Sequence, residues 1–144
     1  MADSTSRKKR LSLAFTSEYE KSARSNPLDE CFALQAGFMA MLREDGRFPP
    51  WPLDLSSKDE QRKLQTFLWD TVREIAEASA TLKNRVHRVK EESFDKSEFL
   101  EEMCDAFAFF MESLMLAGFG PDDLLSEYKR KNAIVRKALI DSER

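Results

Sequence analysis

The fold depends most on the stretch SSKDEQRKLQTFLWDTVREIAEASATLKNRV, positions 56–86. It begins with Ser56 and Ser57, either of which can cap a helix, and Glu60 follows at a capping-box spacing. Apolar residues then recur every three or four positions, which predicts one long amphipathic helix to about Val86. The side of this helix that we expect to be buried carries Leu64, Leu68, Val72, Ile75, Ser79, Leu82 and Val86.

The segment at positions 95–117 predicts a helix that is apolar nearly all round. Asp95 or Ser93 can cap its start, and Gly118 and Gly120 supply the stop. Its main apolar face consists of Leu100, Met103, Cys104, Phe107, Met111 and Leu114. The opposite side combines acidic and apolar residues, namely Glu98, Glu102, Asp105, Phe109, Glu112 and Leu116. Because a solvent face seldom carries such a mixture, we expect another helix or another subunit to cover it.

The flanking segments complete an all-α pattern. Pro27 follows Asn26 at a helix-start signal and predicts a helix over 28–42, while Pro121 opens another that runs to about Ile140. Between the first two helices lies a proline-rich loop, which Phe48 and Trp51 should pin to the body of the protein. Short connections favour antiparallel neighbours, so we expect a bundle of four to five helices that associates into an oligomer.

Length and composition set the wider limits. The 144 residues, with four Gly and five Pro, suit a flexible tail over 1–26 and a single helical domain over 27–144. A net charge of −3 argues against a stable nucleic-acid partner, and the basic run at positions 7–10 is interpreted as part of the solvated tail. The two cysteines stand in apolar stretches, and no signal peptide or membrane span is evident, so a cytoplasmic protein is expected.

Carboxylates on the two central predicted helices are the candidate metal-binding residues. Glu74 and Glu77 are three residues apart beside small alanines, and Glu102 and Asp105 repeat that spacing. Carboxylates gathered away from water must take up protons or bind a cation, and Mg²⁺ suits oxygen ligands and phosphate substrates. However, 26 acidic residues in 144 make such spacings common. A non-catalytic helical interaction protein with solvated acidic faces therefore remains an alternative.

Motifs around these carboxylates carry a family resemblance. Arg73-Glu74-Ile75-Ala76-Glu77 and the segment from Glu101 to Phe109 resemble the ExxE and ExxD motifs of the all-α nucleoside triphosphate pyrophosphatase superfamily. The closest match is the dimeric dUTPase family, which is MazG-like. Phe32-Ala33-Leu34-Gln35 resembles its N-terminal helix, and Tyr128 to Asn132 resembles the start of its YxxKNxxN tail. The likeness covers about residues 28–139.

The resemblance implies a function and a set of site residues. It implies Mg²⁺-dependent hydrolysis of dUTP to dUMP and pyrophosphate by a homodimer or higher homo-oligomer. Glu74, Glu77, Glu102 and Asp105 would hold the metal, and Glu74 or Glu77 would also orient the attacking water. Gln35 would contact the base, and the residues near the nucleotide and its phosphates would be Tyr128, Lys131 and Asn132. On chemistry alone, Lys83 and Arg85 are further candidates for phosphate ligands.

The sequence departs from the family's motifs at two places, and these departures leave undetermined which nucleotide base is accepted. The last Asn of the tail motif is Val135 here, and Val86-His87-Arg88 replaces the Trp-Lys element expected after the ExxE helix. Hydrolysis of dCTP, or a broader MazG-like activity, is therefore the alternative on the same fold. The single histidine, His87, is interpreted as a solvated or helix-capping residue.

Overall fold

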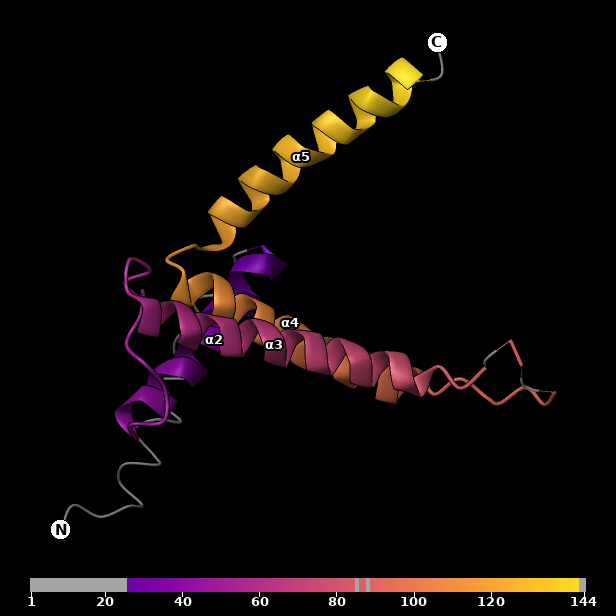
Figure 1. Cartoon of the computed structure of the whole chain (residues 1–144), viewed down its shortest axis with the longest axis horizontal. Helices are drawn as coiled ribbons and strands as arrows, with labels where there is room; N and C mark the ends of the chain where they lie inside the picture. The colour runs from indigo at the N-terminus through magenta and orange to yellow at the C-terminus, as the bar shows by residue number, and fades with distance from the viewer. Residues whose placement is uncertain (1–25, 85, 88, 143–144) are drawn as a thin grey trace. The chain divides into compact units, whose positions relative to one another are not determined.

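A computed structural model describes residues 26–84, 86, 87 and 89–142. Within these residues the fold has four helices and no strand, which confirms the all-α prediction (Figure 1). The helices are α2 (Pro27–Glu44), α3 (Lys58–Thr81), α4 (Lys96–Leu116) and α5 (Pro121–Ser142). The basic run at 7–10 and Arg85, which sequence reasoning singled out, lie outside the described residues.

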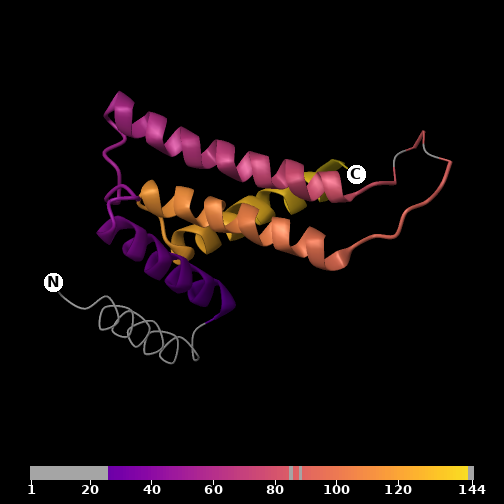
Figure 2. The same cartoon turned by 90° about the horizontal axis from the view of Figure 1, so that it is seen from below.

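The contacts divide the chain into two compact units. One unit spans residues 39–118 and contains α3, α4 and the end of α2. Among the described residues, the other consists of positions 26–38 and 119–142, so it contains the start of α2 and all of α5. In the first unit α3 and α4 lie side by side and antiparallel, joined by the loop at positions 82–95 (Figures 1 and 2). The predicted antiparallel pairing of these two helices is confirmed.

Side-chain caps set the starts of α3 and α4 at residues that the sequence predicts. Ser57 caps α3 by accepting a hydrogen bond from the Glu60 amide, and Asp95 caps α4 by accepting from the amides of Ser97 and Glu98. α4 ends just before Gly118, whose positive φ of 87° suits a residue without a side chain. The predicted end of α3 at Val86 is wrong, because the helix stops at Thr81. Beyond it, the Asn84 side chain bonds the Glu92 backbone, which closes the loop instead of extending the helix.

The core of the 39–118 unit gathers around the end of α4. Leu116 is fully buried, and its carbonyl accepts a hydrogen bond of 2.8 Å from the Leu53 amide. Leu53 belongs to the proline-rich loop between α2 and α3. In that loop Phe48 is buried, and its ring contacts the rings of Trp51 in the loop and Phe67 of α3, with centroid distances of 6.0 and 5.1 Å. Phe48 thus pins this loop to α3, and the Trp51 ring lies 4.9 Å from the guanidinium of Arg43 on α2, as the predicted attachment of the loop requires.

Leu116 offers a direct test of this core. Leu116→Ala removes a side chain with no solvent exposure and leaves a cavity between the loop and α4, so we expect unfolding to become about 2–5 kcal/mol easier. Urea unfolding followed by circular dichroism measures this loss. Leu100→Ala is the matched control, because Leu100 lies on the same helix but is 63% exposed, and it should change stability far less. Equal losses for the two variants would contradict the described core.

No single described helix is long and apolar enough to cross a membrane, and only α4 and α5 taken together across their break reach that length and hydropathy.

Candidate metal centre

Three carboxylates from the two paired helices converge on one point. Glu74 of α3 and Glu102 and Asp105 of α4 each offer an oxygen, and these oxygens lie within 4.8 Å of one another. Glu74 is buried, Glu102 is partly buried and Asp105 is exposed, so the group runs from the helix interface out to solvent. The antiparallel pairing brings Glu74 to Glu102 and Asp105, and the three-residue spacing keeps Glu102 and Asp105 on one side of α4.

The rotation of α3 that creates this group differs from the prediction. The buried residues of α3 are Glu74, Ala78 and Thr81. Most of the apolar stripe that was expected to be buried is instead about half exposed or more, namely Leu68, Val72, Ile75, Leu82 and Val86. The physical reason is that Ala78 and Thr81 are small and let α4 approach closely, and the Thr81 hydroxyl is satisfied by donating to the Ala78 carbonyl at 2.8 Å.

The burial of the two faces of α4 also differs from the prediction. The mixed acidic side is covered as expected only toward the end of α4, where Glu112 is 4% exposed and Leu116 is fully buried, whereas Glu98 and Asp105 are exposed. The face predicted to be the main apolar contact is only partly used. Met111 is buried there, whereas Leu100, Met103 and Cys104 are exposed. The main apolar face is therefore only partly buried in the single chain.

The surroundings of Glu102 disfavour its charged form. Burial is the main factor that raises the pKa of Glu102 above its ordinary value, and repulsion from neighbouring carboxylates adds to it. Those neighbours are Glu77, Glu74, Asp105 and Glu101. A cation placed among these groups would relieve the repulsion, because it favours the charged form of each carboxyl.

Arg73 is the residue at this site that sequence reasoning missed. Its guanidinium lies 3.0 Å from Asp70, 2.9 Å from Glu74 and 3.7 Å from Glu77. The hydrogen bond to Glu74 is the main factor that raises the pKa of Arg73. Arg73 therefore supplies the positive charge that lets Glu74 stay buried. The signal was present in the sequence, because Asp70 and Glu77 stand three positions before and four after Arg73.

Glu77 stands at the edge of the cluster. It is not part of the converging trio in the described residues, and its side chain is 53% exposed. It is nevertheless close enough for its charge to act on Glu102. Its carboxylate contacts Arg73 on one side and reaches water on the other, which suits a group that orients a solvent molecule.

The other predicted ligands belong to the other compact unit of the chain. Gln35 is partly buried on α2, and Tyr128, Lys131 and Asn132 are exposed on α5. All four lie in its described residues, 26–38 and 119–142, whereas the carboxylates belong to residues 39–118. Their proposed contacts with a nucleotide stay predictions.

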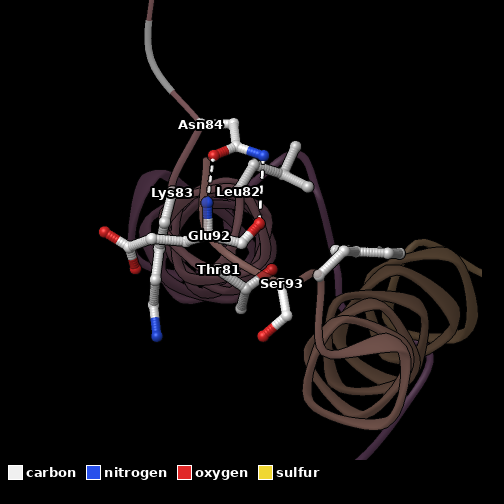
Figure 3. A pocket seen from close by; sticks show the side chains of 7 residues that line it. Thr81, Leu82, Lys83, Asn84, Glu92 and Ser93 are labelled. Atoms are coloured by element: carbon white, nitrogen blue, oxygen red, sulfur yellow. Dashed lines mark hydrogen bonds between the residues drawn. The ribbon is translucent and has the colours of Figure 1, made fainter. Parts of the chain in front are cut away.

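Lys83 lies in the loop that joins α3 and α4. It lines a pocket of about 300 Å³ together with residues that include Thr81, Asn84 and Phe94. Figure 3 shows the two hydrogen bonds by which the Asn84 side chain holds the Glu92 backbone at this pocket. The charge of Lys83 also helps to lower the pKa of Asp95, after the hydrogen bonds from Ser97 and Glu98. His87, in the same loop, is exposed.

No family model, curated protein or solved structure matches this chain.

Proposed function

We propose that this protein hydrolyses dUTP to dUMP and pyrophosphate in a Mg²⁺-dependent reaction at the Glu74, Glu102 and Asp105 cluster. The observation that supports this most is the convergence of these three carboxylates from two helices to within 4.8 Å. The same residues belong to the segments that resemble the ExxE and ExxD motifs, so geometry and sequence pattern single out one place.

The donor set fits magnesium. All three groups offer carboxylate oxygens, which are the ligands that a hard divalent cation prefers, and the exposed Asp105 leaves room for water and phosphate oxygens. The raised pKa of Glu102 indicates negative charge that the protein alone leaves partly uncompensated. When bound there, Mg²⁺ would neutralise phosphate charge and make a water molecule more acidic.

The protein's own residues would divide the remaining work. Glu77, half exposed beside the cluster, would accept a proton from the attacking water and hold it in line with the phosphorus. Arg73 would fix Glu74 in position, because it donates a hydrogen bond of 2.9 Å to that carboxylate. We further propose that Gln35 contacts the base and that Tyr128, Lys131 and Asn132 bind the nucleotide.

A panel of deoxynucleoside triphosphates with pyrophosphate detection tests the substrate. We expect dUTP to be hydrolysed at least about a hundred-fold more efficiently than purine triphosphates, because a hydrogen-bonding pocket strongly rejects bases that leave its polar groups unpaired. Preference for dCTP would move the proposal to the alternative pyrimidine substrate on the same fold. Equal turnover of purine triphosphates would exclude a dUTPase and favour a broader MazG-like pyrophosphatase.

A non-catalytic interaction protein is the second candidate, and one observation favours it. The exposed apolar residues of α3, such as Val72 and Ile75, form a surface suited to protein contacts. Inertness toward every nucleotide, together with no effect of Mg²⁺ on thermal melting, would support this candidate over the enzyme.

A further inference from the structure

The charge of α5 is unlike that of the rest of the chain. Positions 128–140 have the sequence YKRKNAIVRKALI, which contains five basic residues and no acidic one. The whole chain has a net charge of −3, so the residues outside this segment carry −8. The segment lies within α5, one continuous helix that has no buried residue (Figure 1). An exposed, locally basic helix in an acidic protein indicates a partner of negative charge.

Apolar residues form a stripe along one side of this helix. Its members are Leu125, Tyr128, Val135 and Leu139, which are 36%, 66%, 62% and 61% exposed. At about 100° per residue, these four side chains lie within about 80° of one another around the helix axis. We call them the α5 stripe. Side chains of this size, exposed along one line, indicate a surface that an apolar environment covers.

Basic residues border the α5 stripe on both sides. Lys131 lies along one border, and Lys129 and Arg136 lie along the other, each within about 90° of the middle of the stripe. Among the described residues, none of these three side chains forms an ion pair. Their positive charges therefore remain available to an anion outside the chain.

The opposite side of α5 is electrically balanced. Arg130 donates a hydrogen bond of 2.7 Å to Glu127, and the Lys137 ammonium lies 2.6 Å from the Asp141 carboxylate. Ile134 is also turned to this side, so it does not belong to the α5 stripe. Because both basic residues here have an acidic partner, the uncompensated positive charge of α5 is concentrated at the borders of the stripe.

This combination fits an anionic phospholipid surface better than it fits a protein or a nucleic acid. The four apolar side chains expose on the order of 300 Å², whereas a stable protein interface needs ~800 Å² per partner. A second copy would bring the basic borders of two stripes together, and like charges repel. Nucleic acid would pair with the cations but leave the apolar side chains in water. At a membrane surface, acyl chains cover the stripe while the longer basic side chains reach the lipid phosphates.

We propose that α5 lies along the surface of membranes rich in anionic phospholipid. The α5 stripe inserts below the headgroups, and Lys129, Lys131 and Arg136 bind the lipid phosphates. The charged opposite side stays in water, so the helix lies in the surface and does not cross the membrane. The association needs neither nucleotide nor metal and does not rest on the proposed function. Tyr128 and Lys131 are also proposed nucleotide ligands, so one α5 serves only one of the two ligands at a time.

Flotation of the full chain with lipid vesicles tests the proposal. Vesicles of phosphatidylcholine with about one third phosphatidylserine should bind the wild type at least about ten-fold more tightly than phosphatidylcholine alone, and added salt should weaken the binding. Val135→Glu should weaken it about a hundred-fold or more, because it places a charge in the inserted stripe. Ile134→Glu is the matched control. Ile134 is 52% exposed on the opposite side of α5, so the same change there should have an effect of a few-fold at most.

A second variant keeps the apolar stripe and removes charge. Lys129→Gln combined with Arg136→Gln should weaken binding to the anionic vesicles about thirty-fold, because each basic residue near such a surface adds to the attraction. Neither residue is a proposed nucleotide ligand. Circular dichroism shows whether each variant keeps its helices, and if Val135→Glu loses them, the double variant decides.

Several outcomes would overturn the proposal. One is a wild type that binds neither kind of vesicle, or binds both equally. Equal effects of Ile134→Glu and Val135→Glu would show that the stripe is not inserted. A wild type that ignores vesicles but binds an RNA oligonucleotide tightly would assign the cations to nucleic acid. If vesicles are ignored and Val135→Glu sediments as a monomer beside an associated wild type, a second copy covers the stripe.

Discussion

Glu74→Gln is expected to slow pyrophosphate release from dUTP by about a thousand-fold. The substitution keeps the size of the side chain but removes the charge that lies between Arg73 and the oxygens of Glu102 and Asp105. A neutral amide is a poor ligand for a hard divalent cation. Its NH₂ group would face the carboxylates of Glu102 and Asp105, where the metal would otherwise bind. The measurement is steady-state release of pyrophosphate at saturating Mg²⁺ and dUTP.

Glu101→Gln is the control for that variant. Glu101 immediately precedes Glu102 on α4 and carries the same charge, but it is exposed and stands outside the converging trio. Its loss alters the net charge as Glu74→Gln does, so turnover should stay within a few-fold of the wild type. If both variants lost activity equally, general electrostatics and not a built site would explain the loss.

The sequence predicts helix ends well where a local side chain marks them. Ser57, Asp95 and Gly118 each act through hydrogen bonds or backbone torsions within a few residues, and each stands at the predicted end. The end of α3 at Thr81 depends instead on Asn84 reaching Glu92, eight residues along the chain. Helical periodicity carries no information about such a contact, so the predicted helix ran on to Val86.

The rotation of α3 could not be predicted for a different reason. Hydrophobic periodicity identifies the most apolar side of a helix, but it does not tell which partner covers that side. Here α4 packs on Ala78 and Thr81, where close approach is sterically easy, and leaves Val72 and Ile75 exposed. The side of α3 that packs within the chain is therefore not its most apolar side, which stays exposed.

The candidate site was partly accessible from sequence. The spacing of Glu102 and Asp105 places them together on any α-helix, which local geometry guarantees. Their approach to Glu74 depends on how far α3 and α4 slide past one another, and only the structure gives that register. Arg73 escaped notice because a basic residue among acidic ones at helical spacing is usually a solvated ion pair.

Glu102→Gln should make the protein more stable than the wild type without magnesium and less stable than the wild type with saturating magnesium. Without the metal, the variant should melt at a higher temperature than the wild type at pH 7, because it removes a carboxylate whose charge is disfavoured by burial and by Glu77. With saturating Mg²⁺, the wild type should gain about 5–10 °C and the variant little, because a ligand that binds only the folded state must stabilise it. Thermal melting by circular dichroism measures both effects.

The pH dependence of the difference in melting temperature shows whether it comes from the charge of Glu102 or from another effect of the substitution. The pKa of Glu102 is raised in the folded state above its ordinary 4.5. The folded wild type therefore binds a proton more tightly than the unfolded chain, and its stability falls relative to the Gln variant as the pH rises from 4.5 through that raised pKa. Below pH 4.5 both side chains are neutral, so the two proteins should melt alike. A gap in melting temperature that stayed constant across this range would show that the stabilisation does not come from the charge of Glu102.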